Sequence, residues 1–261
     1  MTSPAGQELI DRAAKRLSDL LAPHRELVVG LHLIGSATDG DFHSGQSDLD
    51  FVAVLSRTAS ETELDGLAAL HLDYATDHSL PMLGGVWLTE AELKAGPDAA
   101  VAGPTSLDNN FIRADLAHRN PVTWMSLPAG DAVFGQLNQT PLWQSRKRLM
   151  SWVVENAAGY WTGWHRDASS LWTPRGLRML GRAEPMWGVL GISRLAYTDA
   201  TGEITSKTGA GGWALETFGD DAIVREALAY RAGKPAVIAD LWKRKAEALR
   251  FVARMIGGIV D

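Results

Sequence analysis

The first part of the chain mixes two periodicities of hydrophobic residues. Residues 7–21 carry apolar side chains at helical spacing, whereas three short apolar runs are typical of buried strands. The predicted strands are 27–34, 51–55 and 82–89. Ser60 followed by Glu63 matches a capping box and predicts that a helix begins between the second and third strands. We therefore expect an N-terminal domain of α+β (α/β-type) class, residues 1–138, with a small mixed sheet flanked by helices.

After about residue 140 the strand patterns fade and helical spacing dominates. The predicted helices are 143–164, 187–200, 206–218, 220–230 and 235–256. The glycines in 209–212 should weaken the third of these, so we expect close packing or a ligand there. Glycine and proline mark 96–107 as a loop and 168–181 as a connector. The second domain, residues 139–261, is predicted to be an all-α helical bundle, and a cleft between domains is the usual place for a ligand.

Composition narrows the class of protein. The 261 residues are 46% hydrophobic and 21% charged, which suits a sizeable core and speaks against global disorder. The absence of cysteine excludes disulfides, thiolate metal sites and cysteine nucleophiles. A net charge of −6 argues against sequence-independent binding of nucleic acid. The N-terminal residues lack the apolar core of a signal peptide, and no run is long enough to span a bilayer. We expect a cytoplasmic protein, a monomer or weak dimer, with no membrane or nucleic acid partner.

A pair of aspartates marks the start of the second predicted strand. Asp48 and Asp50 flank Leu49, and side chains two apart in a strand point to the same face. Carboxylates this close repel each other unless a cation lies between them. Mg²⁺ is commonly held by one or two carboxylates together with substrate phosphates. Gly35 and Ser36, at the end of the first strand, can bring a backbone and a hydroxyl close to the same phosphates.

These residues carry a resemblance to a known superfamily. Gly35-Ser36 after a strand, then a loop, then Ser47-Asp48-Leu49-Asp50 at the next strand resembles the signature of the DNA polymerase beta-like nucleotidyltransferases. The resemblance implies that Asp48 and Asp50 are catalytic and bind Mg²⁺, with Gly35, Ser36 and Ser47 on the nucleotide. The alternative interpretation is a surface aspartate pair that caps a strand.

The second domain carries a more specific resemblance. Residues 187–215 read WGVLGISRLAYTDATGEITSKTGAGGWAL, which is similar to the helical domain of the aminoglycoside adenylyltransferases that modify streptomycin and spectinomycin. Ser206 is a candidate N-cap with Lys207 in the first helical turn, where a helix N-terminus suits a triphosphate. The resemblance implies that Arg194 and Lys207 contact the phosphates of ATP. The other interpretation is two ordinary solvated cations.

The same resemblance suggests where an acceptor would bind. Relatives hold a cationic drug with acidic and aromatic residues of the helical domain, and Glu184 falls where such an acid would lie. Trp161 and Trp164 are candidate aromatic walls, and Asp167 could add negative charge. The alternative for the tryptophans is packing in the core.

One expected carboxylate is missing. In the resembled enzymes a third acid, on the strand after the two aspartates, accepts the proton of the attacking hydroxyl. Here that strand contains no acid, and Gly84, or else Leu83, stands at the matching position. Three explanations are open. The alignment with the resembled enzymes is shifted, another residue acts as the base, or the protein binds the nucleotide but transfers it weakly or not at all. The other bases considered are Asp73, Asp77 and His78.

Three functions therefore compete. The first is an adenylyltransferase that moves AMP from ATP to a hydroxyl of a small, aminoglycoside-like acceptor in an antibiotic-resistance reaction, with Mg²⁺ as cofactor. The second is a nucleotide-binding protein of the same fold with weak or lost transfer, because of Gly84. The third is a nucleotidyltransferase that acts on a protein or a nucleic acid, which the acidic balance disfavours.

Overall fold

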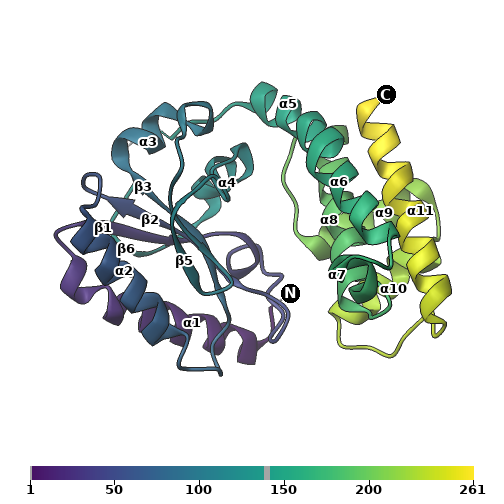
Figure 1. Ribbon diagram of the computed structural model, residues 1–261, viewed down its shortest axis with the longest axis horizontal. Helices are drawn as coiled ribbons and strands as arrows, with labels where there is room; N and C mark the ends of the chain where they lie inside the picture. Colours follow the sequence, from purple (N-terminus) through teal and green to yellow (C-terminus); the bar gives the residue numbers. More distant parts are fainter. Residues whose placement is uncertain (1, 138–141) are drawn as a thin grey trace. The chain divides into compact units, whose positions relative to one another are not determined.

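The computed structural model describes residues 2–137 and 142–261, which form two compact units (Figure 1). The units are Met1–Ser145 and Arg146–Asp261. The predicted boundary between residues 138 and 139 lies outside the described residues. The first unit is a six-stranded mixed sheet with helices and the second is helical, which confirms the predicted α+β plan with a C-terminal helical bundle.

The N-terminal unit is built around one sheet with strand order β5-β4-β3-β2-β1-β6. Strands β2 and β3 are parallel, and all other neighbours are antiparallel. In chain order its elements are α1 (Pro4–Leu20), β1 (Val28–Leu33), β2 (Leu49–Leu55), α2 (Glu61–Tyr74), β3 (Leu83–Thr89), α3 (Glu90–Ala95), β4 (Gly103–Leu107), β5 (Asn110–Asp115), α4 (Pro121–Ser126) and β6 (Asp131–Phe134). Both halves of the Ser60–Glu63 capping box form at the start of α2, as predicted.

The two faces of the sheet pack against different helices because side chains alternate along each strand. Leu49 and Phe51 belong to a core that includes residues of α1 and α2, which run side by side in Figure 1. Val52 and Val54 belong to a second core, with Leu93 of α3 and Trp124 of α4. Asp50 is two residues before Val52 in β2, so its side chain lies on the same face of the strand as Val52 and Val54, the face that packs against α3 and α4.

A hairpin replaces part of the predicted loop 96–107. Strand β4 begins at Gly103 and pairs with β5 through a turn at Asp108 and Asn109, both with positive φ. The hydrophobic pattern did not predict β4, because its buried residues Thr105 and Ser106 are polar. Ser106 is fully buried, and its hydroxyl donates to the Leu83 carbonyl over 3.1 Å.

The C-terminal unit packs its helices around α8. Its elements are α5 (Arg146–Asn156), a π-helical turn (Ala157–Trp161), α6 (Thr162–Ser169), α7 (Pro174–Arg178), α8 (Ala183–Thr201), α9 (Lys207–Phe218), α10 (Ala222–Arg231) and α11 (Leu241–Val260). Among the glycines of α9, Gly211 has a packing role, because a Cβ on it would lie 2.6 Å from the Leu228 side chain of α10, whereas a Cβ on Gly212 would meet nothing within 4 Å. The predicted connector 168–181 contains the short helix α7. Among the described residues, no helix is both long enough and apolar enough to cross a bilayer.

A π-helical turn lies at the start of the aromatic region of this unit. The backbone N–H of Thr162 donates to the carbonyl of Ala157, five residues earlier, so the turn holds one residue more than an α-helical turn. Trp161 and Trp164 are three residues apart and so share a helix face, and both are in the core, 5% and 1% exposed. Tyr160 keeps 48% of its surface exposed.

His71 provides a pH-dependent contribution to stability. It is buried in α2 among Phe51, Trp87 and Phe111, and this burial lowers its pKa to about 4. An unfolded histidine titrates near about 6.5, so between these values the unfolded state binds a proton that the folded state does not. We expect wild type to lose about 3 kcal/mol of stability, relative to His71→Phe, as the pH falls from about 6.5 to about 4. Urea unfolding of wild type and His71→Phe across this pH range measures the difference in their free energies of unfolding. A difference that does not change with pH would contradict the prediction.

Candidate functional site

The two predicted metal-binding aspartates lie where β2 begins. Asp48 directly precedes the strand and Asp50 is its second residue, and both side chains are half-buried. The Leu49 N–H donates to the Met82 carbonyl over 2.8 Å, and the Ile34 N–H donates to the Asp50 carbonyl over 3.0 Å. Leu49 is fully buried on the opposite face of the sheet. These backbone contacts to both neighbouring strands fix the aspartate pair on a rigid part of the fold.

Gly35 brings the backbone against the Asp50 carboxylate. Its φ is +67°, and a Cβ built on it would lie 2.9 Å from Asp50 Oδ2. The N–H groups of Thr38 and Asp39 both donate to the Gly35 carbonyl over 2.9 Å, which closes a tight turn. Any side chain at position 35 would strain the turn and intrude on the carboxylate. The turn thus places the backbone of Gly35 directly against the Asp50 carboxylate.

The loop between the two strands is held by its own polar contacts. The Ser47 hydroxyl oxygen accepts the His43 N–H over 3.0 Å, and His43 Nε2 lies 3.1 Å from Asp41 Oδ1. Ser47 is 9% exposed, so its first role is to shape the loop that precedes Asp48. Ser36 is half-buried and its carbonyl accepts the Asp41 N–H over 3.3 Å. The structure therefore brings Gly35, Ser36 and Ser47 into one loop with the aspartates.

Position 84 lies directly beside Asp50 in the sheet. The parallel register pairs Asp50 with Gly84 and Leu49 with Leu83. A Cβ on Gly84 would lie 3.1 Å from Asp50 Oδ1, whereas Leu83 is fully buried in the α1/α2 core. Gly84, and not Leu83, therefore occupies the place from which a third carboxylate would reach the pair. Within the described residues, no group of three or more His, Asp or Glu side chains could hold a metal ion.

The donor set still fits Mg²⁺. Asp48 and Asp50 offer hard oxygen donors, and neither is fully buried. Mg²⁺ commonly keeps several waters and takes one or two carboxylates plus substrate phosphates. A pair of carboxylates next to the Gly35 turn matches a site of this kind.

A histidine that the sequence did not single out lies next to position 84. A Cβ on Gly84 would lie 3.9 Å from Cε1 and 4.0 Å from Nε2 of His118. Burial lowers the pKa of His118, and the charges of Asp115, Asp48 and Asp108 oppose that shift. His118 follows β5 and is 34 residues away from Gly84 in the sequence, so no local motif connects them.

The other bases considered from sequence are engaged at the surface. Asp73 accepts a hydrogen bond from Arg16 Nη2 over 2.9 Å, and both side chains are exposed. Asp77 accepts hydrogen bonds from the Ser79 hydroxyl and N–H, which lower its pKa. His78 is exposed in the same turn. These contacts offer no support for any of the three as a base.

In the C-terminal unit, Arg194 and Lys207 gather at the N-terminus of α9. Ser206 is the N-cap, since its hydroxyl oxygen accepts the Gly209 N–H over 3.1 Å, as predicted. Lys207 is the first helical residue. Arg194 of α8 donates through Nε to the Thr205 carbonyl over 3.0 Å. Two cations and a helix N-terminus thus form an anion-binding arrangement.

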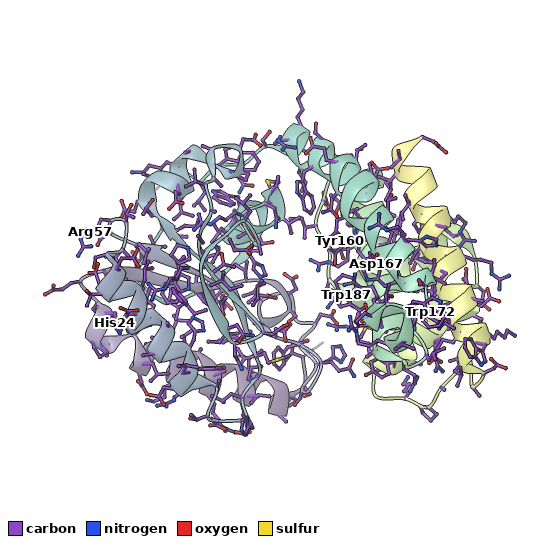
Figure 2. All side chains as sticks on the ribbon, in the orientation of Figure 1. His24, Arg57, Tyr160, Asp167, Trp172 and Trp187 are labelled. Atoms are coloured by element: carbon purple, nitrogen blue, oxygen red, sulfur yellow. The ribbon has the colours of Figure 1, made fainter. Side chains whose placement is uncertain are left out.

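The predicted aromatic walls Trp161 and Trp164 lie inside the helical core rather than on its surface. Trp187 stacks on both, with ring centroids 5.3 Å and 6.1 Å away and interplanar angles of 29°. Tyr160 meets Trp187 at a centroid distance of 6.3 Å, and Figure 2 labels both on the helical unit. Within this group of four rings, the exposed surface belongs to Tyr160 and the half-buried Trp187, which pack against the two predicted residues.

The charge of Glu184 is already balanced. Arg175 Nε and Arg178 Nε donate to its two oxygens over 3.0 Å and 2.9 Å. Arg175 also lies 3.7 Å from Asp167. The sequence missed this because α7, which supplies both arginines, fell in the predicted connector. Trp172, just before α7, is 97% exposed and was also missed.

Comparisons with known proteins agree with this architecture. Residues 172–257 match the family described as aminoglycoside adenylyltransferase, C-terminal domain. The fold is similar to a crystal structure of spectinomycin adenyltransferase AAD(9) from Enterococcus faecialis with ATP and spectinomycin. That match has a TM-score of 0.72 at 12% sequence identity and covers 94% of this chain and 98% of the other. At this identity it establishes a shared fold. No curated protein sequence matches the chain.

Proposed function

We propose that this aminoglycoside adenylyltransferase-like protein transfers AMP from ATP to a hydroxyl of a small, aminoglycoside-like acceptor. The observation that carries the proposal is the pair Asp48 and Asp50, fixed by backbone contacts at the start of β2 with the Gly35 turn against Asp50. The matches of the C-terminal domain and of the whole fold to aminoglycoside adenylyltransferases support the same reaction class.

The chemistry assigns a role to each group. The acceptor oxygen attacks the α-phosphorus of ATP, a new O–P bond forms, the bond to pyrophosphate breaks, and the hydroxyl proton leaves to a base. Asp48 and Asp50 would hold Mg²⁺, which neutralises phosphate charge as it accumulates. Gly35 admits the phosphates close to the backbone, with the Ser36 hydroxyl beside it.

Arg194 and Lys207 are proposed to bind the triphosphate. Their position at the N-terminus of α9 supports this role. A charge-assisted contact to phosphate contributes about 1.5–3 kcal/mol, so Lys207→Ala is expected to raise the KM for ATP by about 10-fold to 100-fold. Steady-state kinetics over a range of ATP concentrations measures this. Lys243→Ala, on the exposed first turn of α11, is the matched control, and an equal effect of the two changes would contradict the role.

Gly84 favours one alternative, a nucleotide-binding protein with weak or lost transfer. Loss of a general base costs about 10²–10⁴-fold in rate, so such a protein would bind ATP with Mg²⁺ but turn over slowly.

The ion pairs of Glu184 affect which acceptor we expect. A polycationic drug would have to compete with Arg175 and Arg178 for this carboxylate, which favours an acceptor of lower positive charge.

One experiment separates these outcomes. Calorimetric titration of the protein with ATP and Mg²⁺, with and without streptomycin or spectinomycin, is followed by mass analysis of the mixture. A drug heavier by one adenylyl group, absent with Asp48→Asn/Asp50→Asn, is the expected result. Magnesium-dependent ATP binding without a modified drug would favour the alternative or a different acceptor. No binding of ATP would overturn the assignment of the aspartate site.

A further inference from the structure

The space beside Asp50 that lacks a carboxylate is bordered by an imidazole. A Cβ on Gly84 would be 3.1 Å from Asp50 Oδ1 on one side and 4.0 Å from His118 Nε2 on the other. A side chain at position 84 would therefore meet both Asp50 and His118. A proton acceptor is missing from β3, and a group that can accept a proton borders the same volume.

His118 is held in place by a turn that is anchored to β3 itself. The Ala117 N–H donates to Asp115 Oδ1 over 2.6 Å, and the Arg119 N–H donates to the Leu116 carbonyl over 3.0 Å. The Arg119 side chain is fully buried and donates to the Trp87 carbonyl over 2.8 Å. It also forms a 2.6 Å ion pair with Glu92. The strand that carries Gly84 thus also fixes the turn that carries His118.

The backbone of His118 is unusual. Its φ is +60°, in the left-handed region that most residues other than glycine seldom adopt, although asparagine, aspartate and histidine are enriched there. Such a conformation costs about 1–3 kcal/mol and persists where the surroundings hold it. The contacts of Arg119 and Asp115 hold this turn.

The charge state of His118 suits a proton acceptor. Burial lowers its pKa, which favours the neutral imidazole near neutral pH. Asp115 at the end of β5, Asp48 on the loop before β2 and Asp108 in the turn before β5 act in the opposite direction. Because Asp48 is proposed to hold Mg²⁺, Asp115 and Asp108 are the carboxylates that would stabilise the imidazolium once a proton is taken up.

We propose that His118 accepts the proton of the attacking hydroxyl, the task for which β3 provides no carboxylate. This assignment rests on the proposed adenylyl transfer. As the acceptor oxygen bonds to the α-phosphorus and pyrophosphate departs, the hydroxyl proton moves to the imidazole and is released to solvent afterwards. ATP and the hydroxyl compound give the adenylylated compound, pyrophosphate and one proton.

The positive φ dictates which variants test this role. His118→Asn and His118→Gly both tolerate the left-handed backbone, and neither can accept a proton. We expect kcat for drug adenylylation to fall by about 10²–10⁴-fold, with the KM for ATP little changed. Added imidazole is expected to restore part of the rate of His118→Gly only. Gly84→Glu, which places a carboxylate in the adjoining volume, is expected to restore rate in the His118→Asn background.

A second readout does not depend on turnover. Diethyl pyrocarbonate labelling followed by peptide mass mapping should show that ATP with Mg²⁺ protects His118 but leaves the exposed His78 reactive. His78→Asn is the comparison variant, because His78 is the other histidine considered as a base. Normal transfer by His118→Asn, loss of transfer in His78→Asn instead, or unprotected His118 would each overturn the assignment while adenylyl transfer itself stands. Wild type that binds ATP with Mg²⁺ but transfers AMP to no hydroxyl compound, drug or otherwise, even slowly, would overturn both proposals.

Discussion

Asp50→Asn is expected to lower adenylyl transfer by about 10³-fold or more without unfolding the protein. The amide keeps the size of the carboxylate but loses the charge that would hold Mg²⁺, and several kcal/mol of transition-state stabilisation go with it. The backbone of residue 50 is held independently, because its carbonyl accepts the Ile34 N–H and Leu49 is bound to Met82. The effect should therefore fall on kcat and on magnesium-dependent ATP binding.

The measurement is the initial rate of pyrophosphate release with ATP and spectinomycin or streptomycin, together with thermal unfolding of each variant. Asp11→Asn makes the same chemical change on the exposed side of α1 and is the control. If Asp50→Asn kept more than a tenth of the wild-type rate, the carboxylate would not be a metal ligand of the reaction.

Glu226→Ala is expected to have the largest effect on stability, about 3–5 kcal/mol. Glu226 of α10 is 2% exposed and accepts hydrogen bonds from Arg182 Nε over 2.6 Å and from the N–H groups of Val237 and Ile238 over 2.5 Å and 3.1 Å. Its removal leaves a charged donor and two backbone donors without this partner inside the helical unit.

Urea unfolding followed by circular dichroism measures this loss. Glu216→Ala, at an exposed position of α9, is the matched control and should change stability by no more than about 0.5 kcal/mol. A loss below about 1 kcal/mol for Glu226→Ala would mean that the loop before α11 finds other partners. The same contacts explain why α11 begins at Leu241 and not at the predicted Pro235, because the N–H groups of residues 237 and 238 bind Glu226.

The sequence predicted those parts of the site that lie on strongly periodic elements. The place of Gly84 was expected from the family resemblance, with Leu83 left open, and the register pairs Gly84 with Asp50. The strand that ends before Gly35, the facing of Leu49 away from Asp50 and the Ser206 cap follow from local pattern. Each depends on residues close in sequence or on the simplest connection between neighbouring strands.

The parts that could not be predicted depend on contacts between distant segments. His118 reaches position 84 because Arg119 binds the Trp87 carbonyl, 32 residues away, and nothing in the local sequence signals that contact. Glu184 was expected to offer its charge to an acceptor, but two arginines of an unforeseen short helix pair with it. Helical spacing also cannot reveal the π-helical turn at Ala157–Trp161, although packing in the core was the stated alternative for Trp161 and Trp164.

That turn also makes the core of the helical unit sensitive to chain length. Each residue of an α-helix advances the side-chain direction by about 100°, so a one-residue deletion at the turn would rotate the direction of every preceding side chain relative to α6. Leu149, Val153 and Ala157 are fully buried, so such a rotation would turn these side chains away from their places in the core. Gly159 has no atom within 4 Å of a Cβ position, so a side chain added there meets no neighbour. A change of length in this turn therefore disturbs the core of the helical unit, whereas a substitution at position 159 does not.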